Sequence, residues 1–247
     1  MGLFDFLSSK PTTAKIEKAM KRMLNEHHQQ QVRQESMEEL LAYGTPLAIE
    51  ALTRRFAMNF RDTIVNEQEK RWVADTLVEQ FAERAVEPLV TFLHKEQNVS
   101  YAIRTLSRLV DADRLVDEML NALKLYAPAD HRTIQARLQF VDALNDHPHT
   151  HIIPALLPYL RDHDDDVRIK VTELLERKAK DAPEHLPDVG RALADVLTDA
   201  EASGRILRRV AEALIVLDID ARDALPDLEK HLPDGYAVSP AGRLIRR

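Results

Sequence analysis

HIIPALLPYLRDHDDDVRIKVTELLERKAK, residues 151–180, is the stretch that decides the fold. Its first part has apolar residues at helical spacing, with Pro154 in the first turn, where proline is well tolerated. A polar run, 161–166, follows, and its aspartates predict a turn that caps the next helix. Four apolar residues of that helix, spaced i, i+4, i+7 and i+8, form a single stripe: Val167, Val171, Leu174 and Leu175. The stretch therefore predicts a pair of amphipathic helices.

The same unit recurs along the chain, with a period of roughly 30 to 40 residues. The last leucine of each first helix marks the units at Leu52, Leu93, Leu123, Leu160, Leu197 and Leu232. Second helices are expected at 31–43, 67–82, 99–111, 133–145, 166–180 and 204–217. A single amphipathic pair cannot bury its own stripe, whereas stacked pairs form a continuous core. The prediction is an all-α solenoid of about six helix pairs over residues 30–232.

The best-formed unit resembles the HEAT-repeat family. Residues of the family pattern stand in it at Pro154, Asp162, Val167 and Arg168. The resemblance implies an armadillo-like α-α superhelix in which the arginine and the turn aspartate brace neighbouring repeats. An arginine also follows the start of the stripe in Lys70-Arg71 and Leu207-Arg208, but not in Val99-Ser100 or Ile134-Gln135.

Composition narrows the class of protein. The 247 residues are 45% hydrophobic and 30% charged, with only 6 Gly and 5% aromatics, which favours amphipathic helices over sheet. The absence of Cys excludes disulfides, a thiolate nucleophile and thiolate zinc sites. No window approaches the roughly 18 apolar residues of a membrane span, so we expect a cytoplasmic protein. A net charge of −7 argues against general nucleic-acid binding.

The two ends depart from the repeat. Residues 1–29 are predicted to cap the array with a helix, whose apolar stripe is Ile16, Met20, Met23 and Leu24. Alternatively, this basic helix and the apolar side chains before it dock weakly on a partner or an anionic membrane surface: Leu3, Phe4, Phe6 and Leu7. Residues 233–247 form either a frayed tail or a short β-hairpin, with strands on both sides of a turn at 239–242.

Candidate contact residues lie in the second helices and in one long connection. Scattered arginines, together with the single Trp, are the expected anchors for a partner: Arg71, Trp72, Arg104, Arg108, Arg137, Arg168 and Arg208. The alternative for each arginine is pairing within the helices. The connection 57–66 is longer than usual, so Met58, Phe60 and Ile64 either form a contact site or pack as additional core.

No motif indicates chemistry. The histidines at 147, 149, 151 and 163 have no HExxH pattern and no helical i, i+4 pair to organise a metal, and we predict that none binds. The aspartates at 162–166 lack the Gly and Glu of an EF-hand loop, so we interpret them as a solvated capping turn. No Gly-rich phosphate loop or nucleophile motif occurs. We therefore predict no catalytic residues and no cofactor.

The expected function is that of a noncatalytic scaffold that holds a protein or peptide on the concave face of the solenoid. The partner is not identified by any motif. The alternative is a nucleic-acid-binding or base-processing enzyme, because some HEAT-like proteins are DNA glycosylases. The near-neutral second helices and the single Trp make that alternative the weaker one. Some HEAT-like proteins are bilin lyases, and nothing in the sequence separates that class from a scaffold.

Overall fold

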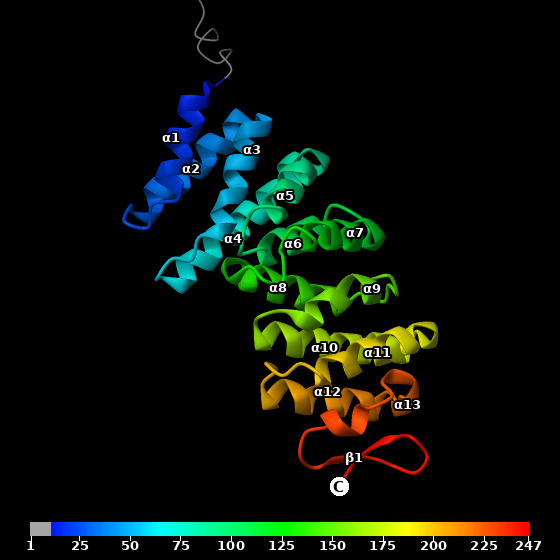
Figure 1. The fold of residues 1–247 in the computed structure, drawn as a ribbon. Helices are drawn as coiled ribbons and strands as arrows, with labels where there is room; N and C mark the ends of the chain where they lie inside the picture. The colour runs from blue at the N-terminus through cyan, green and yellow to red at the C-terminus, as the bar shows by residue number, and fades with distance from the viewer. Residues whose placement is uncertain (1–10) are drawn as a thin grey trace, which may run out of the picture. The chain divides into compact units, whose positions relative to one another are not determined.

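The structure is a computed structural model that describes residues 11–247, and helices make up most of it (Figure 1). The chain falls into two compact units, residues 1–122 and 123–247. Within the described residues the only sheet has two short strands. The predicted all-α class is confirmed.

The first unit has two layers of helices. Its helices are α1 (Thr13–Met23), α2 (Gln30–Tyr43), α3 (Pro46–Thr53), α4 (Thr63–Thr76), α5 (Val86–Leu93), α6 (Ser100–Leu106) and α7 (Ala112–Leu123), the last running to the boundary. Short segments of other helical types occupy Arg54–Ala57, Leu77–Phe81 and Ala82–Ala85. Helix α3 packs between α1 and α5, and α4 packs between α2 and α6. Alternate helices therefore stack on one another, as paired repeats require.

The second unit repeats this arrangement. It contains α8 (Ile134–Leu144), α9 (Ile152–Leu156), α10 (Asp165–Lys180), α11 (Leu186–Leu197), α12 (Gly204–Val216) and α13 (Ala221–Ala224). Helix α10 packs on both α8 and α12, and the three lie side by side in Figure 1. Helix α11 packs on α12, on α13 and on the 3-10 segment Leu157–Arg161 that continues α9. A single solenoid over 30–232 stays a prediction.

Local chemistry explains where the helices begin. Asp164 caps α10, because its Oδ1 accepts hydrogen bonds from the backbone N of Asp166 at 3.0 Å and of Val167 at 3.1 Å. Thr45 and Ser203 cap α3 and α12 in the same way. Pro46 occupies the first turn of α3, where no backbone donor is needed. The Asp164 cap confirms the prediction that the polar run 161–166 caps the next helix.

One burial pattern unites the second helices. In α10 the buried residues include Val167, Arg168, Val171, Thr172 and Leu175. The buried residues of α8 have the same spacing: Ala136, Arg137, Phe140, Val141 and Leu144. An arginine thus follows the first stripe residue in α8 as well, two residues after the position expected from the sequence. Ala136 is the third residue of α8, as Val167 is the third residue of α10, so the stripes of the two helices begin at the same helical position.

The stripe of α10 supplies a stability prediction. Leu174 is 2% exposed between the neighbouring helices, so Leu174→Ala is expected to lower the free energy of unfolding by about 3 kcal/mol through a cavity. Glu173→Ala, at the exposed neighbouring position, should change it by less than about 0.5 kcal/mol. Denaturant titration followed by circular dichroism measures both. Equal effects of the two variants would contradict the assignment of the stripe.

The C-terminal hairpin is confirmed and is docked on α12. Strand β1 (Tyr236–Val238) pairs antiparallel with β2 (Leu244–Arg246). A guanidinium NH2 of Arg246 lies 2.7 Å from Oε2 of Glu212 in α12, and the Tyr236 hydroxyl donates to the same carboxylate. These hydrogen bonds, led by that of Arg246, lower the pKa of Glu212. A hairpin this small is marginal alone, so its contacts with α12 stabilise it.

Helix α1 packs on α2 and α3. Ile16 and Met23 of the predicted stripe are buried, Met20 and Leu24 partly so. The apolar side chains at residues 3–7 lie outside the described residues. None of the helices in residues 11–247 combines the length and the apolar character needed to cross a membrane.

Candidate partner-binding surface

The predicted contact residues divide into buried and exposed groups. Arg137, Arg168 and Phe60 are buried, at 0%, 7% and 6% exposure. Trp72 is partly buried. The remaining predicted residues are exposed: Met58, Arg71, Arg104, Arg108 and Arg208. Only the exposed group is placed to meet a partner.

Arg137 is a structural residue of the second unit. A guanidinium NH2 of Arg137 donates to Oδ1 of Asp162 at 3.0 Å, and its Nε lies 2.6 Å from Oδ2, out of line for a hydrogen bond. The other terminal nitrogen donates to the carbonyls of Ala127 and Asp130 and to the Thr133 hydroxyl. Arg137 therefore clamps the turn before α8 to the turn before α10. Its placement does not support the predicted role as a partner anchor.

Arg168 is also engaged inside the second unit. Its Nε donates to the Leu160 carbonyl, and its NH2 donates to Oδ2 of Asp199, both at 3.0 Å. Asp199 lies in the turn before α12, so each arginine bonds to the turn that precedes the next second helix. The aspartates at 162–166, interpreted as a solvated turn, include one buried member, because Asp162 is 1% exposed.

Phe60 packs beneath a buried ion cluster in the first unit. Glu69 of α4 accepts from Nε of Arg33 and from Nε of Arg55, each at 2.9 Å. The Phe60 ring lies against both guanidinium groups, 3.9 Å from that of Arg55 and 4.9 Å from that of Arg33. Phe60 therefore packs as additional core and anchors the connection 57–66. Met58 and Ile64 of the same connection are 36% and 70% exposed.

A cluster of charged and aromatic side chains lies above this core, between α4 and α6. We call it the Tyr101 surface, and it comprises Glu67, Lys70, Arg71, Tyr101 and Arg104. The Tyr101 ring stacks on the buried Phe56 ring with centroids 5.5 Å apart and planes 18° apart. The Arg104 guanidinium lies 4.3 Å from the Tyr101 ring centroid, and the Lys70 ammonium lies 5.4 Å from it. The ring is therefore fixed between apolar core and cations.

The electrostatics of the Tyr101 surface reflect its three cations. Burial, followed by the hydrogen bond to Glu67, raises the pKa of Tyr101, while Arg104 and Arg71 lower it. Burial also lowers the pKa of Lys70, and the nearby Arg55 and Arg104 lower it further. Lys70 is 4% exposed and donates to Oδ1 of Asn59 at 2.7 Å, a neutral partner. The Tyr101 surface thus contains one buried cation, Lys70, beneath the exposed Arg71 and Arg104.

Other exposed cations are paired within their own unit. Arg108 lies 2.7 Å from Oδ1 of Asp75 across α4 and α6. In the second unit Arg209 bonds to Glu176 at 2.6 Å and Arg205 to Asp166 at 2.7 Å. Arg208 is exposed near Tyr236, whose pKa is raised by burial and by the hydrogen bond to Glu212, and Arg208 opposes that shift. Arg71 thus lies on α4, Arg104 on α6 and Arg108 directly after α6, whereas Arg208 lies in the second unit.

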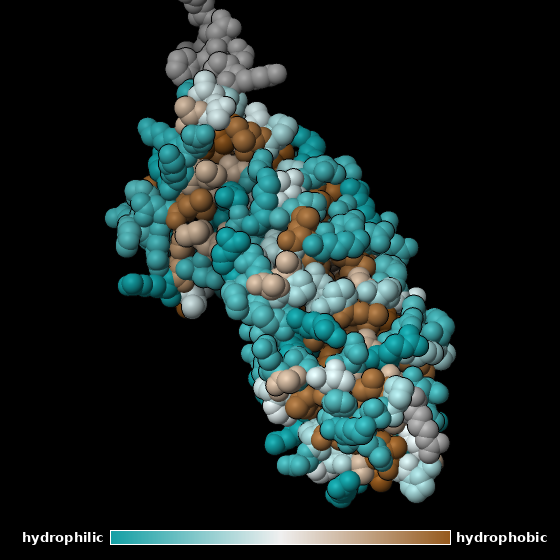
Figure 2. All heavy atoms as spheres, in the orientation of Figure 1, coloured by the Kyte–Doolittle hydropathy of each residue, from teal (hydrophilic) through white to brown (hydrophobic). Residues whose placement is uncertain are grey.

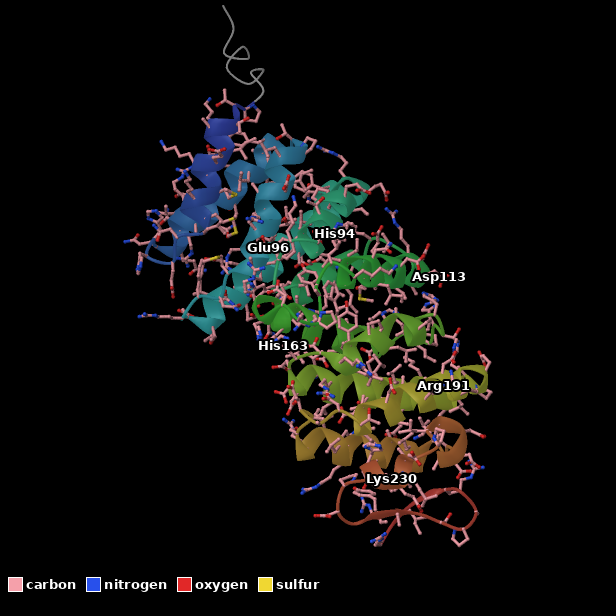
Figure 3. The ribbon with its side chains drawn as sticks, in the orientation of Figure 1. His94, Glu96, Asp113, His163, Arg191 and Lys230 are labelled. Atoms are coloured by element: carbon pink, nitrogen blue, oxygen red, sulfur yellow. The ribbon has the colours of Figure 1, made fainter. Side chains whose placement is uncertain are left out.

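Among residues 11–247 no group of histidines and carboxylates is arranged to hold a metal ion. Within the second unit His163, Arg191 and Lys230 come from separate elements and do not converge (Figure 3). A hollow of about 600 Å³ near the C-terminus contains Lys230, which is paired with Asp227, and its lining includes no histidine. The visible face of each unit is mostly hydrophilic, with small separate apolar patches (Figure 2).

Sequence reasoning missed Lys70, Tyr101 and Glu67 as members of one site. Their proximity depends on the packing of α4 against α6, which no local pattern encodes. A signal for Lys70 did exist. The α10 spacing, applied to α4, selects five residues that are all buried: Glu69, Lys70, Val73, Ala74 and Leu77.

Comparison of the chain with protein families, with curated proteins and with solved structures found no match.

Proposed function

We propose that this chain is a noncatalytic, cytoplasmic binding module that holds a protein or peptide against its second helices, with the Tyr101 surface as the main contact. The observation that carries the proposal is a pair of exposed arginines, Arg71 and Arg104, beside an aromatic ring on a rigid support. Arginine and tyrosine are enriched among residues that dominate binding energy. The resemblance to HEAT repeats, whose helices present extended binding surfaces, agrees with this proposal.

The support beneath the surface favours binding by pre-organisation. Phe56 fixes the Tyr101 ring from below, and the Arg104 guanidinium is held by that ring and by the Ser100 carbonyl. Side chains that are already ordered lose less conformational entropy when a partner arrives. Ile64, one turn before Gln68 on α4, adds an exposed apolar side chain next to the charged residues.

A nucleic-acid-binding function is the weaker candidate. Binding to a phosphate backbone requires several cations that are free to neutralise phosphates. In the second unit Lys170, Arg205 and Arg209 instead pair with carboxylates of neighbouring helices. The net charge of −7 also repels a polyanion.

Photocrosslinking tests the proposal. A benzophenone amino acid replaces the exposed Gln68, between Ile64 and Arg71 on α4, and a matched variant carries it at Glu87 on α5, whose side chain is 83% exposed. Irradiation in nuclease-treated native lysate should yield discrete protein adducts from position 68 and not from position 87. The proposal fails if position 68 gives no protein adduct, or if nuclease treatment removes every adduct.

A further inference from the structure

The charges of the Tyr101 surface do not balance. Lys70, Arg71 and Arg104 face one carboxylate, Glu67, which accepts a hydrogen bond from Tyr101. Among residues 11–247 neither Arg71 nor Arg104 has a carboxylate within salt-bridge distance, whereas the nearby Arg108 is paired with Asp75. Arg71 on α4 and Arg104 on α6 are thus unpaired beside the paired Arg108, which follows α6, and both are free to meet a negative group of a partner.

Arg104 is held in a geometry that leaves the two terminal nitrogens of its guanidinium group available to a ligand. Its Nε donates to the Ser100 carbonyl at 3.3 Å, and its guanidinium lies over the Tyr101 ring. Its two terminal nitrogens have no hydrogen-bond partner within the described part of the chain. Such a fork matches the two oxygens of a carboxylate. The arginine is thus oriented before any ligand binds.

Lys70 supplies a second reason to expect an anion. Its side chain is almost fully buried and its hydrogen-bond partner, Asn59, is neutral, so the nearby Glu67 carboxylate only partly offsets the lost hydration. Arg55 and Arg104, which both lower its pKa, add repulsion. An external carboxylate bound at the rim would offset that repulsion, since charge interactions are strong near a partly desolvated surface.

We infer that the Tyr101 surface recognises an acidic segment of a protein partner, with Arg71 and Arg104 donating to its carboxylates and Ile64 contacting an apolar side chain beside them. The inference rests on the proposed function and names the chemistry of the partner. Glu67 lies within the site and offsets part of the positive charge of its three cations. Each of the two exposed arginine forks matches the two oxygens of one carboxylate, so we assign aspartate and glutamate as the recognised residues.

Fluorescence anisotropy with defined peptides tests this inference on the full chain. The probe is a labelled peptide of about a dozen residues, mostly Glu with Leu at every fourth position. One matched peptide has Gln at every Glu position, and another has phosphoserine in place of one central Glu. The acidic peptide should bind and the Gln peptide should not. Equal binding of the first two peptides, or binding of neither, would overturn the inference, as would phosphoserine strengthening binding more than about tenfold.

Substitutions then locate the binding. Arg71→Gln and Arg104→Gln should each weaken binding of the acidic peptide about 5- to 10-fold, and the double variant by more than either alone. Arg108→Gln changes the net charge equally at a paired residue and should stay within about twofold. Because these side chains are exposed, circular dichroism should report unchanged folding. Equal effects of all three single variants would mean nonspecific attraction and contradict the site.

The lysate experiment separates this inference from the proposed function. With benzophenone at position 68, the double Arg71→Gln, Arg104→Gln variant should lose most of its protein adduct. If the adduct persists at its original yield, a protein still docks there without acidic recognition. The inference then fails and the proposed function stands.

Discussion

Glu69→Ala is expected to lower the free energy of unfolding of the first unit by about 5 kcal/mol, the upper end of the range for breaking a buried ion pair. Glu69 is 2% exposed and is the carboxylate that both Arg33 and Arg55 contact, at 2.8 and 2.9 Å. Removing it leaves two buried guanidinium groups facing one another without their shared ion-pair partner. Burial already lowers the pKa of Arg55, and Glu69 is the main group that opposes that shift.

Trp72 provides the measurement for this prediction, because the only Trp of the chain lies three residues from Glu69 on α4 and is partly buried. Its fluorescence in a denaturant titration reports on the first unit specifically, which matters because two compact units need not unfold together. Glu67→Ala, on the exposed side of the same helix, is the matched control and should cost less than about 1 kcal/mol. A loss under about 1 kcal/mol for Glu69→Ala would contradict the cluster.

A compensating variant distinguishes lost charge balance from lost packing. Methionine substitutions at Arg33 and Arg55 remove both buried cations and keep most of the side-chain volume. In the Glu69→Ala background they are expected to restore more than about half of the lost stability, since buried ion pairs are often replaceable by apolar residues. If stability falls further, the arginine stems matter more than the charges.

The fold was largely predictable because each helix carries its own local signals. Capping residues, Pro46 and the apolar stripe of α10 are all readable within a few residues of sequence. The hairpin was predictable as one of two options, because Gly and Pro residues delimit two short apolar runs. Its attachment to α12 through Glu212 was not, since that carboxylate is distant in sequence from Arg246.

One misassigned residue and one omission had a physical origin. In α8 the first residue of the buried stripe is Ala136, but the larger Ile134 was taken as its start. Arg137 then fell outside the predicted stripe and was counted as a surface cation, although it is buried. In α4 the run Glu67–Arg71 is wholly polar, and nothing in its composition separates buried Glu69 and Lys70 from exposed Glu67 and Arg71. Extending the spacing of Val73 and Leu77 backwards by one turn would have separated them.

The candidate site was less predictable than the fold. Arg71 and Arg104 were candidates from their positions on second helices, and the structure brings both to Tyr101. Which arginines keep a free guanidinium depends on pairing across helices, as between Arg108 and Asp75. Such pairs join residues more than thirty positions apart, beyond the reach of helical periodicity.

Asp162→Ala is expected to lower the free energy of unfolding of the second unit by about 4 kcal/mol. Asp162 and Arg137 are both fully enclosed, and the Asp162 carboxylate also accepts from the backbone N of Asp164 at 3.0 Å. Without the carboxylate the guanidinium keeps its carbonyl partners but loses its buried ion-pair partner, and the turn before α10 loses an internal bond. Hydrogen exchange followed by mass spectrometry measures the effect, as faster exchange of α8 and α10.

Asp164 and Asp166 of the same turn serve as controls, because neither forms an ion pair with a buried arginine. Asp166 forms an exposed pair with Arg205, so Asp166→Ala should cost less than about 1 kcal/mol. Asp164 caps α10, so Asp164→Ala should cost about 1 kcal/mol and affect mainly the first turn of that helix. The order Asp162, Asp164, Asp166 follows from burial and bonding alone. If Asp162→Ala were no worse than Asp166→Ala, the clamp between the two turns would not be a main source of stability in this unit.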